Sequence, residues 1–254
     1  MRSLINKFGR WLPHGYGDAG KQLGLFVLAE LSYEAVRGVA DSARDQALVN
    51  GQNVISLEKS LHTFFEPNLQ QVFIDHRWII DFANYMYLNS HFVVTTVFLV
   101  WLYLFRNQNF YFVRNMFMVA MALAIVGYAL VPTMPPRLFP EEGFVDTITD
   151  YAQVNHDSAL VKLFVNPYAA IPSMHIAFST MIGVTGIFVT RHRISKILWA
   201  AYPVLVFWVV VVTANHFWID GAAGLLVAVL AALAAREVLA RARPAVWSFR
   251  PATT

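Results

Sequence analysis

The chain has 254 residues, of which 57% are hydrophobic and only 14% are charged. This composition is too apolar for an ordinary soluble domain and indicates an integral membrane protein. The net formal charge is a modest +3, cysteine is absent, and no basic run or nucleic-acid motif is found. These features exclude thiol catalysis, disulfides and Cys-based metal sites, and they set nucleic-acid binding aside.

The apolar stretches predict an all-α, polytopic fold with six transmembrane helices in one integral membrane domain covering the whole chain. The first stretch is the weakest, because Glu30, Glu34 and Arg37 interrupt it. The two glutamates also argue against a cleavable signal peptide, whose apolar region is free of charge. The predicted spans are about 22–38, 79–105, 112–131, 174–190, 197–214 and 217–239.

The distribution of basic residues predicts the orientation of these spans. Most of the 19 Lys and Arg residues lie in the two termini and in the loops after the second and fourth spans. The positive-inside rule then places both termini in the cytoplasm. The starts of the fourth and sixth spans and the loop after the third therefore meet at the external face, in what we expect to be a bacterial plasma membrane.

Two external segments separate the spans. Residues 54–76 predict an amphipathic pair of short helices in the membrane interface, for which a lid without chemistry is the simplest interpretation. Residues 132–171 form the longest external loop and are rich in proline and acidic residues. Long loops are usually functional or disordered, and this one lies between two parts of the candidate site.

His216 and Asp220 open the sixth span and are four residues apart, so on a helix their side chains share a face. A carboxylate that accepts a hydrogen bond from one imidazole nitrogen leaves a basic lone pair on the other nitrogen. His216 is therefore a candidate nucleophile that attacks phosphorus and forms a phosphohistidine. His175, at the start of the fourth span, is a candidate proton donor to the leaving oxygen. Arg137 offers a planar donor fork for phosphate, and Ser173 adds a hydroxyl beside a helix N-terminus. This scheme predicts no cofactor and no metal.

Simpler interpretations of the same residues remain open. A single histidine at a membrane interface is often only an amphipathic residue, and the His216/Asp220 pair with His175 could instead bind zinc. Further candidates for substrate contact are Tyr87 and His91 on the second span, and Asn166 and Tyr168, which could meet a polyol acceptor. For the residues on the second span the alternative is hydrogen bonding between helices.

At these residues the chain resembles the type 2 phosphatidic acid phosphatase (PAP2) superfamily. The resemblance rests on Pro172-Ser173-Met174-His175 and on His216-Phe217-Trp218-Ile219-Asp220, with Arg137 upstream. It covers the third to sixth spans and, more loosely, Glu58, Glu66 and Gln70. These variants look more like the branch that contains inositol phosphorylceramide synthases, sphingomyelin synthases and bacterial inositolphosphotransferase-like proteins.

The departures from the phosphatase branch support that branch assignment. Met174 replaces a glycine, the segment 209–215 directly before His216 contains no arginine, and the lysine of the first motif is absent. The resemblance implies that His216 is the nucleophile, that Asp220 orients it, and that His175 handles the leaving or attacking hydroxyl. A thinner cationic lining suits a phosphodiester, which carries less charge than a monoester.

The predicted function is therefore a lipid phosphotransferase or phosphodiesterase at the external face. Its substrate would be a membrane phospholipid, with an inositol-phosphate headgroup favoured, and its acceptor an alcohol (polyol) or water. One alternative is a phosphatase for a lipid phosphate or a polyprenyl pyrophosphate. Another is a non-catalytic lipid transporter or scaffold.

Overall fold

The computed structural model describes residues 12–40, 43–152 and 168–242, and over these ranges the protein is all-helical. Each predicted span coincides with a helix. Most helix limits lie within about five residues of the predicted ones, but the first helix begins at Gly15, well before its predicted start at about residue 22. These six helices are α2 (Gly15–Ala40), α5 (Arg77–Phe105), α6 (Asn107–Leu130), α9 (Met174–Val189), α10 (Arg193–Val212) and α11 (Trp218–Leu233), the last continuing through a π-helical turn, η4 (Ala234–Leu239), into α12 (Ala240–Ala242).

Not all of these helices are long and apolar enough to cross a membrane. Within the described ranges, three qualify, namely α6, α10 and the continuous helix Trp218–Ala242. Helix α5 becomes a fourth if its two halves, bent by 46° between Ser90 and Phe92, count as one span. Helix α9 has only 16 residues, about 24 Å at 1.5 Å per residue. The structure thus indicates an integral membrane protein with three or four spans, and six spans stay a prediction.

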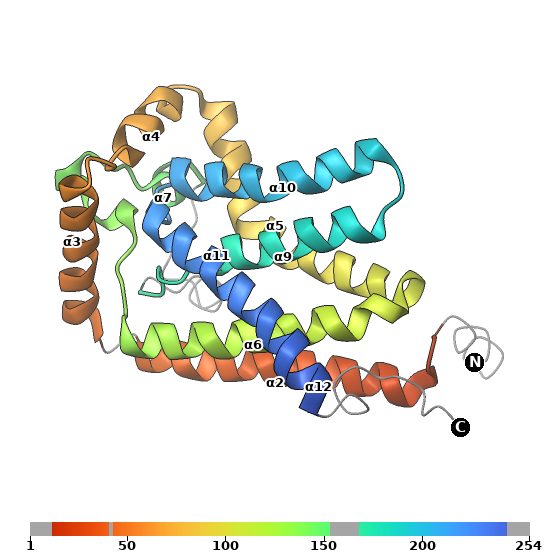
Figure 1. The fold of residues 1–254 in the computed structure, drawn as a ribbon. Coiled ribbons are helices and arrows are strands. Elements are labelled where there is room, and N and C mark those ends of the chain that lie inside the picture. The colour runs from red at the N-terminus through yellow and green to blue at the C-terminus, as the bar shows by residue number, and fades with distance from the viewer. Residues whose placement is uncertain (1–11, 41–42, 153–167, 243–254) are drawn as a thin grey trace.

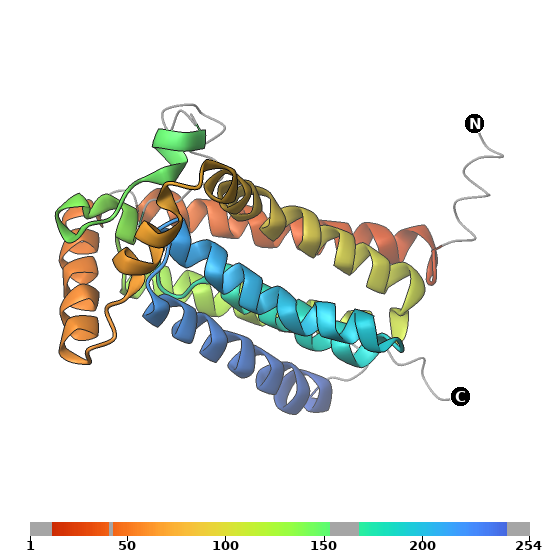
Figure 2. The same ribbon diagram turned by 90° about the horizontal axis from the view of Figure 1, so that it is seen from above.

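The segment expected to form an amphipathic pair of helices is helical. Helix α3 (Arg44–Ser60) begins ten residues before the predicted start at residue 54, and α4 (Glu66–Ile74) carries Pro67 in its first turn, where proline suits a helix. Helix α3 stands crosswise at one end of the bundle, and α4 lies beside it (Figures 1 and 2). These two helices cover the end of the bundle where α10 ends and α11 begins.

The turns and helix ends fall into two groups at opposite ends of the bundle (Figure 1). The α5–α6 turn, the α9–α10 turn, the start of α2 and α12 lie at one end, and α3, α4 and the start of α11 lie at the other (Figure 1). The loop after α6 contains two 3-10 turns, η2 (Pro136–Leu138) and η3 (Pro140–Glu142), and a short helix, α7 (Thr147–Ala152). The described part of the predicted 132–171 loop is therefore structured.

Glycines allow α9 to pack closely against both α10 and α11. A Cβ on Gly186 would lie 2.4 Å from Trp199 Cγ on α10, and one on Gly224 of α11 would lie only 2.2 Å from the carbonyl oxygen of Ser173. Such short separations are possible only without a side chain. The start of α9, which carries His175, and the start of α11, which follows His216, are held together as a result.

Candidate active site

The His216/Asp220 pair expected from the sequence is formed, but not on one helix face as predicted, because α11 begins at Trp218 and His216 lies in the turn before it. Both side chains are buried, and His216 Nδ1 lies 3.3 Å from Asp220 Oδ2 and 3.1 Å from the carbonyl oxygen of Ala170. Ala170 is held in place by a β-bridge between Thr133 and Ala169, in which its amide donates to the Thr133 carbonyl. The segment before α9 therefore helps to orient the imidazole that precedes α11.

These two contacts determine the imidazole tautomer. A carbonyl oxygen can only accept a hydrogen bond, so Nδ1 must be the protonated nitrogen that donates to both Ala170 and Asp220. In neutral His216 the lone pair then lies on Nε2. The carboxylate of Asp220 also accepts the amide of Phe217 at 2.9 Å, which fixes its orientation. His216 is thus arranged as a base or nucleophile that reacts through Nε2.

His175 lies beside this imidazole, as predicted. The ring centroids of His175 and His216 are 5.6 Å apart and inclined at 58°. Tyr87 of α5 stacks on the ring of His175, with centroids 4.5 Å apart and an interplanar angle of 21°. The imidazole of α9 and the imidazole that precedes α11 therefore lie side by side, and an aromatic side chain of α5 stacks on the first of them.

Ser173 is the residue immediately before α9 and is completely buried. Its amide donates to the Asp220 carbonyl at 3.0 Å, while its hydroxyl oxygen has no hydrogen-bond partner among the described residues. A buried hydroxyl without a partner costs stability unless something binds it. Together with the positive end of the α9 dipole, this hydroxyl forms a cradle suited to an anion.

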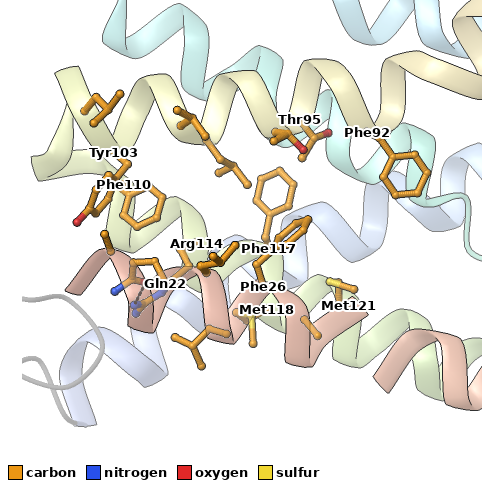
Figure 3. A pocket seen from close by; sticks show the side chains of 18 of the residues that line it. Gln22, Phe26, Phe92, Thr95, Tyr103, Phe110, Arg114, Phe117, Met118 and Met121 are labelled. Atoms are coloured by element: carbon orange, nitrogen blue, oxygen red, sulfur yellow. Dashed lines mark hydrogen bonds between the residues drawn. The ribbon is translucent and has the colours of Figure 1, made fainter. Parts of the chain in front are cut away.

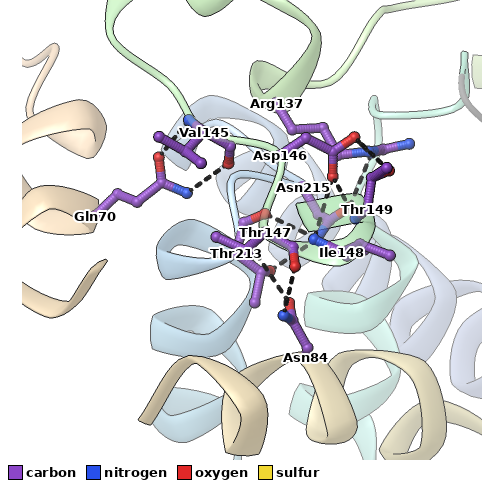
Figure 4. Close-up of polar contacts among 10 residues, drawn as sticks. All are labelled: Gln70, Asn84, Arg137, Val145, Asp146, Thr147, Ile148, Thr149, Thr213 and Asn215. Carbon is purple, nitrogen blue, oxygen red and sulfur yellow. Dashed lines mark hydrogen bonds and ion pairs between the residues drawn. The ribbon is translucent and has the colours of Figure 1, made fainter. Parts of the chain in front are cut away.

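Arg137 comes from the loop after α6 and is only 5% exposed. Its Nη1 donates to Asn215 Oδ1 at 2.9 Å, and its Nε lies 3.7 Å from a carboxylate oxygen of Asp146 (Figure 4). Its amide donates to the carbonyl of Ala214 at 2.7 Å. Because Asn215 directly precedes His216, the guanidinium is fixed to the same turn that carries the candidate nucleophile.

The loop that carries Arg137 is itself anchored by buried amides (Figure 4). Asn84 of α5 donates to the Thr147 carbonyl at 2.9 Å, and Gln70 of α4 exchanges hydrogen bonds with the backbone of Val145. Gln70 also donates to the carbonyl of Val212 at the end of α10. These ties make the position of the guanidinium a property of the assembled fold.

The sequence did not reveal the roles of Asn215, Asp146, Glu58 and Glu66. Asn215 could have been suspected as the neighbour of His216, and Asp146 as one acid among many in the loop. Glu58 and Glu66 are completely buried and contact the first turn of α11. Burial, followed by the neighbouring Glu66 charge, raises the pKa of Glu58, and burial also raises the pKa of Glu66.

Other predicted contacts are placed differently or lie outside the described residues. Tyr168 is partly buried against the cluster formed by α3, the Arg137 loop and the start of α11, and its carbonyl accepts the Thr133 amide. Asn166 and the side chain of His91 lie outside the described part of the chain. No group of three His, Asp or Glu side chains within the described ranges is arranged to hold a metal ion, so the zinc alternative gains no support.

A large apolar cavity lies between α2, α5 and α6 (Figure 3), and none of the candidate site residues that the structure describes lines it. Its volume is about 980 Å³, at the upper end of the usual 300–1,000 Å³ for ligand pockets. Polar groups lie mainly at one end, where Arg114 donates to Gln22 at 2.8 Å. Phe178, one helical turn after His175, contributes to the lining. The cavity is therefore shaped and lined for an apolar group.

The carboxylate-bound imidazole, the second imidazole and the buried guanidinium form a candidate site for phosphoryl transfer at one end of the helical bundle. The family model described as the PAP2 superfamily matches residues 52–234, and the chain belongs to that superfamily. Members are generally phosphatases or phosphotransferases that act on phosphate esters. No curated protein and no solved structure matches the chain. The match concerns the superfamily as a whole, so assignment to one branch stays a prediction.

Proposed function

We propose that the protein is a lipid phosphotransferase or phosphodiesterase that transfers a phosphate-bearing headgroup, of the inositol-phosphate type, through a phosphohistidine at His216. The observation that carries this proposal is the pair of acceptors on His216 Nδ1, which leaves Nε2 as the reactive nitrogen. The second imidazole, His175, is close enough to exchange protons with the oxygen that leaves or attacks.

The reaction has two steps. In the first, Nε2 of His216 attacks phosphorus, the bond from phosphorus to the lipid oxygen breaks, and protonated His175 donates its proton to that oxygen. Asp220 stabilises the positive charge on the phosphorylated imidazole. In the second, neutral His175 takes a proton from an alcohol or water, whose oxygen attacks phosphorus and releases His216. Arg137, Ser173 and the start of α9 bind the non-bridging oxygens in both steps.

Two further features support a lipid diester as substrate. The apolar cavity between α2, α5 and α6 suits an alkyl chain. Arg137 is the one cationic side chain that the described residues place against the His216 turn, which suits the single charge of a diester. We further propose that this end of the bundle faces outward with both termini cytoplasmic, and that Tyr87, His91, Asn166 and Tyr168 line the path of a polyol acceptor.

The test uses the full chain purified in detergent and a panel of phospholipids with and without inositol, with products identified by mass spectrometry. Wild type is compared with His216→Ala and with a matched control, His192→Ala, whose exposed side chain lies at the α9–α10 turn. We expect wild type and the control to release diacylglycerol or ceramide with a phosphorylated alcohol, and His216→Ala to release neither.

Other outcomes separate the alternatives. Inorganic phosphate from monoesters, with diesters untouched, would assign the protein to the phosphatase alternative. Turnover that survives His216→Ala would overturn the phosphohistidine mechanism. Lipid movement without any product, unchanged in His216→Ala, would favour the transporter.

A further inference from the structure

Two glutamates outside the catalytic group are completely buried against the first turn of α11. Glu66 of α4 accepts the amide of Trp218 at 2.9 Å, and Glu58 of α3 accepts the amide of Ile219 at 3.4 Å. The indole of Trp218 also donates to Thr63, which lies between the two glutamates in the chain, at 3.2 Å. Helices α3 and α4 are therefore fastened directly to the turn that follows His216.

Carboxyl groups receive the first amides of this helix in succession. Asp220 accepts the amide of Phe217, Glu66 that of Trp218 and Glu58 that of Ile219. The first amides of a helix have no partner within it, so these contacts satisfy groups that would otherwise bind water or an anion. These three amides are consequently not free to bind the phosphate of a substrate.

Three buried carboxylates cannot all be ionised so close together, because burial and like charge both favour the neutral form. The hydrogen bonds show which glutamate is neutral. Glu66 accepts amides with both oxygens, from Trp218 on one and from Phe65 at 3.0 Å on the other, as an ionised carboxylate does. Glu58 receives only one long amide contact, and its carboxyl group also forms a hydrogen bond with the Glu66 carboxylate, which two ionised carboxylates could not form. The proton therefore belongs on Glu58.

The charged groups around the pair do not remove the need for this proton. Two negative charges face Glu58: the Glu66 carboxylate on α4 and the Asp220 carboxylate on α11. Lys59 is the next residue after Glu58 on α3, but its side chain is half exposed and forms an ion pair with Glu142. That ion pair is on the surface, so it does not neutralise the buried pair.

We propose that Glu58 and Glu66 are positioning residues that act as a unit: protonated Glu58 and ionised Glu66 fix the first turn of α11, and with it His216, in the reactive orientation. Glu66 supplies one negative charge near the Asp220/His216 pair, and Glu58 supplies a neutral acceptor for the next amide. The effect of this pair on catalysis rests on the proposed function of His216. The assignment of one proton to the Glu58/Glu66 pair does not depend on that function.

The shared proton is tested by infrared spectroscopy of the full chain in detergent at neutral pH. We expect a C=O stretching band of a protonated carboxyl group in wild type. The band should be absent from Glu58→Gln and retained in Glu142→Gln, a matched change on the neighbouring ion pair. Absence of the band from wild type, or its survival in Glu58→Gln, overturns the assignment. This measurement needs no substrate, so it stands even if the proposed reaction fails.

The positioning role is tested by pH profiles of kcat and KM for the diester turned over by wild type. Glu58→Gln, an isostere of the protonated acid, should retain kcat within about twofold. The Glu58→Gln/Glu66→Gln double variant should lose kcat at least tenfold with KM little changed. Its acid limb should move to lower pH, because the lost negative charge no longer favours a protonated imidazole.

Three outcomes would contradict this positioning role. They are a loss in Glu58→Gln as large as in the double variant, an unmoved acid limb, and full activity of the double variant. If the double variant does not fold, the activity of Glu58→Gln and its infrared spectrum still decide between the outcomes.

Discussion

Gly224→Ala should separate the two first turns that form the candidate site. Gly224 lies on α11, one turn after Asp220, and faces the residue that precedes α9. A Cβ at this position would lie 2.2 Å from the Ser173 carbonyl oxygen and 3.1 Å from its carbonyl carbon. The nearest ordinary contact is 3.4 Å, so the helix must move by roughly 1 Å. Because the obstacle is backbone, no side-chain rotation relieves it.

This movement acts on the distances that the proposed chemistry requires. His216 and Asp220 move with α11, whereas Ser173 and His175 stay with α9, so the anion cradle and the two imidazoles separate. A misplacement of about 1 Å at a reacting group can cost about 100-fold in rate, which corresponds to about 2.7 kcal/mol. Overpacking of this kind also destabilises folding by about 1–3 kcal/mol.

The assay is kcat for the substrate turned over by wild type, measured together with the thermal unfolding midpoint in detergent. Gly221→Ala is the matched control, since it adds the same methyl group one turn earlier on α11. Its new Cβ would lie 3.2 Å from the Phe207 ring, a side chain that can adjust. We expect the control to stay within about threefold of wild-type kcat, below 1 kcal/mol. A Gly224→Ala enzyme with wild-type kcat would refute the close-packing argument.

Three further predictions concern single side chains. Ser173→Ala should leave the free energy of unfolding unchanged or raise it by about 1 kcal/mol, because a buried hydroxyl without a partner is removed. The value of kcat/KM should nevertheless fall about tenfold, because a donor to the anion is lost. Equal losses of stability and activity would contradict this prediction. Arg137→Lys should lower kcat/KM by about 10- to 100-fold, because an ammonium cannot replace a fork held by Asn215 and Asp146; steady-state kinetics on the diester would show it, and wild-type values would refute it. Burial and then the Glu66 charge raise the pKa of Glu58 above 4.5 in the folded state. The folded protein therefore holds a proton that the unfolded chain loses, and its stability falls as pH rises from about 4.5 toward the raised pKa. Unfolding midpoints across this range should fall less steeply in Glu58→Gln, and parallel curves would contradict the assignment.

Much of the architecture was readable from hydropathy and charge. Long apolar stretches predicted each of the six long helices of the bundle, and helical spacing predicted the pair α3 and α4. The limits were less accurate, since α3 begins at Arg44 and α2 at Gly15, in polar sequence that apolar periodicity cannot detect. The number of membrane spans also stays open, because α2 carries several charges and α9 is short.

The sequence by itself determined the local chemistry. His216 and Asp220 are four residues apart, and the sequence predicted their contact, but α11 begins only at Trp218, so the contact joins the turn before the helix to its first turn. The motifs around His175 and His216 already indicated the superfamily. The tertiary structure decided everything that depends on contacts between distant segments. It places the Ala170 carbonyl on His216, Asn215 on Arg137, and Glu58 and Glu66 on the first turn of α11. Such contacts follow from how helices pack, and no spacing along the chain specifies them.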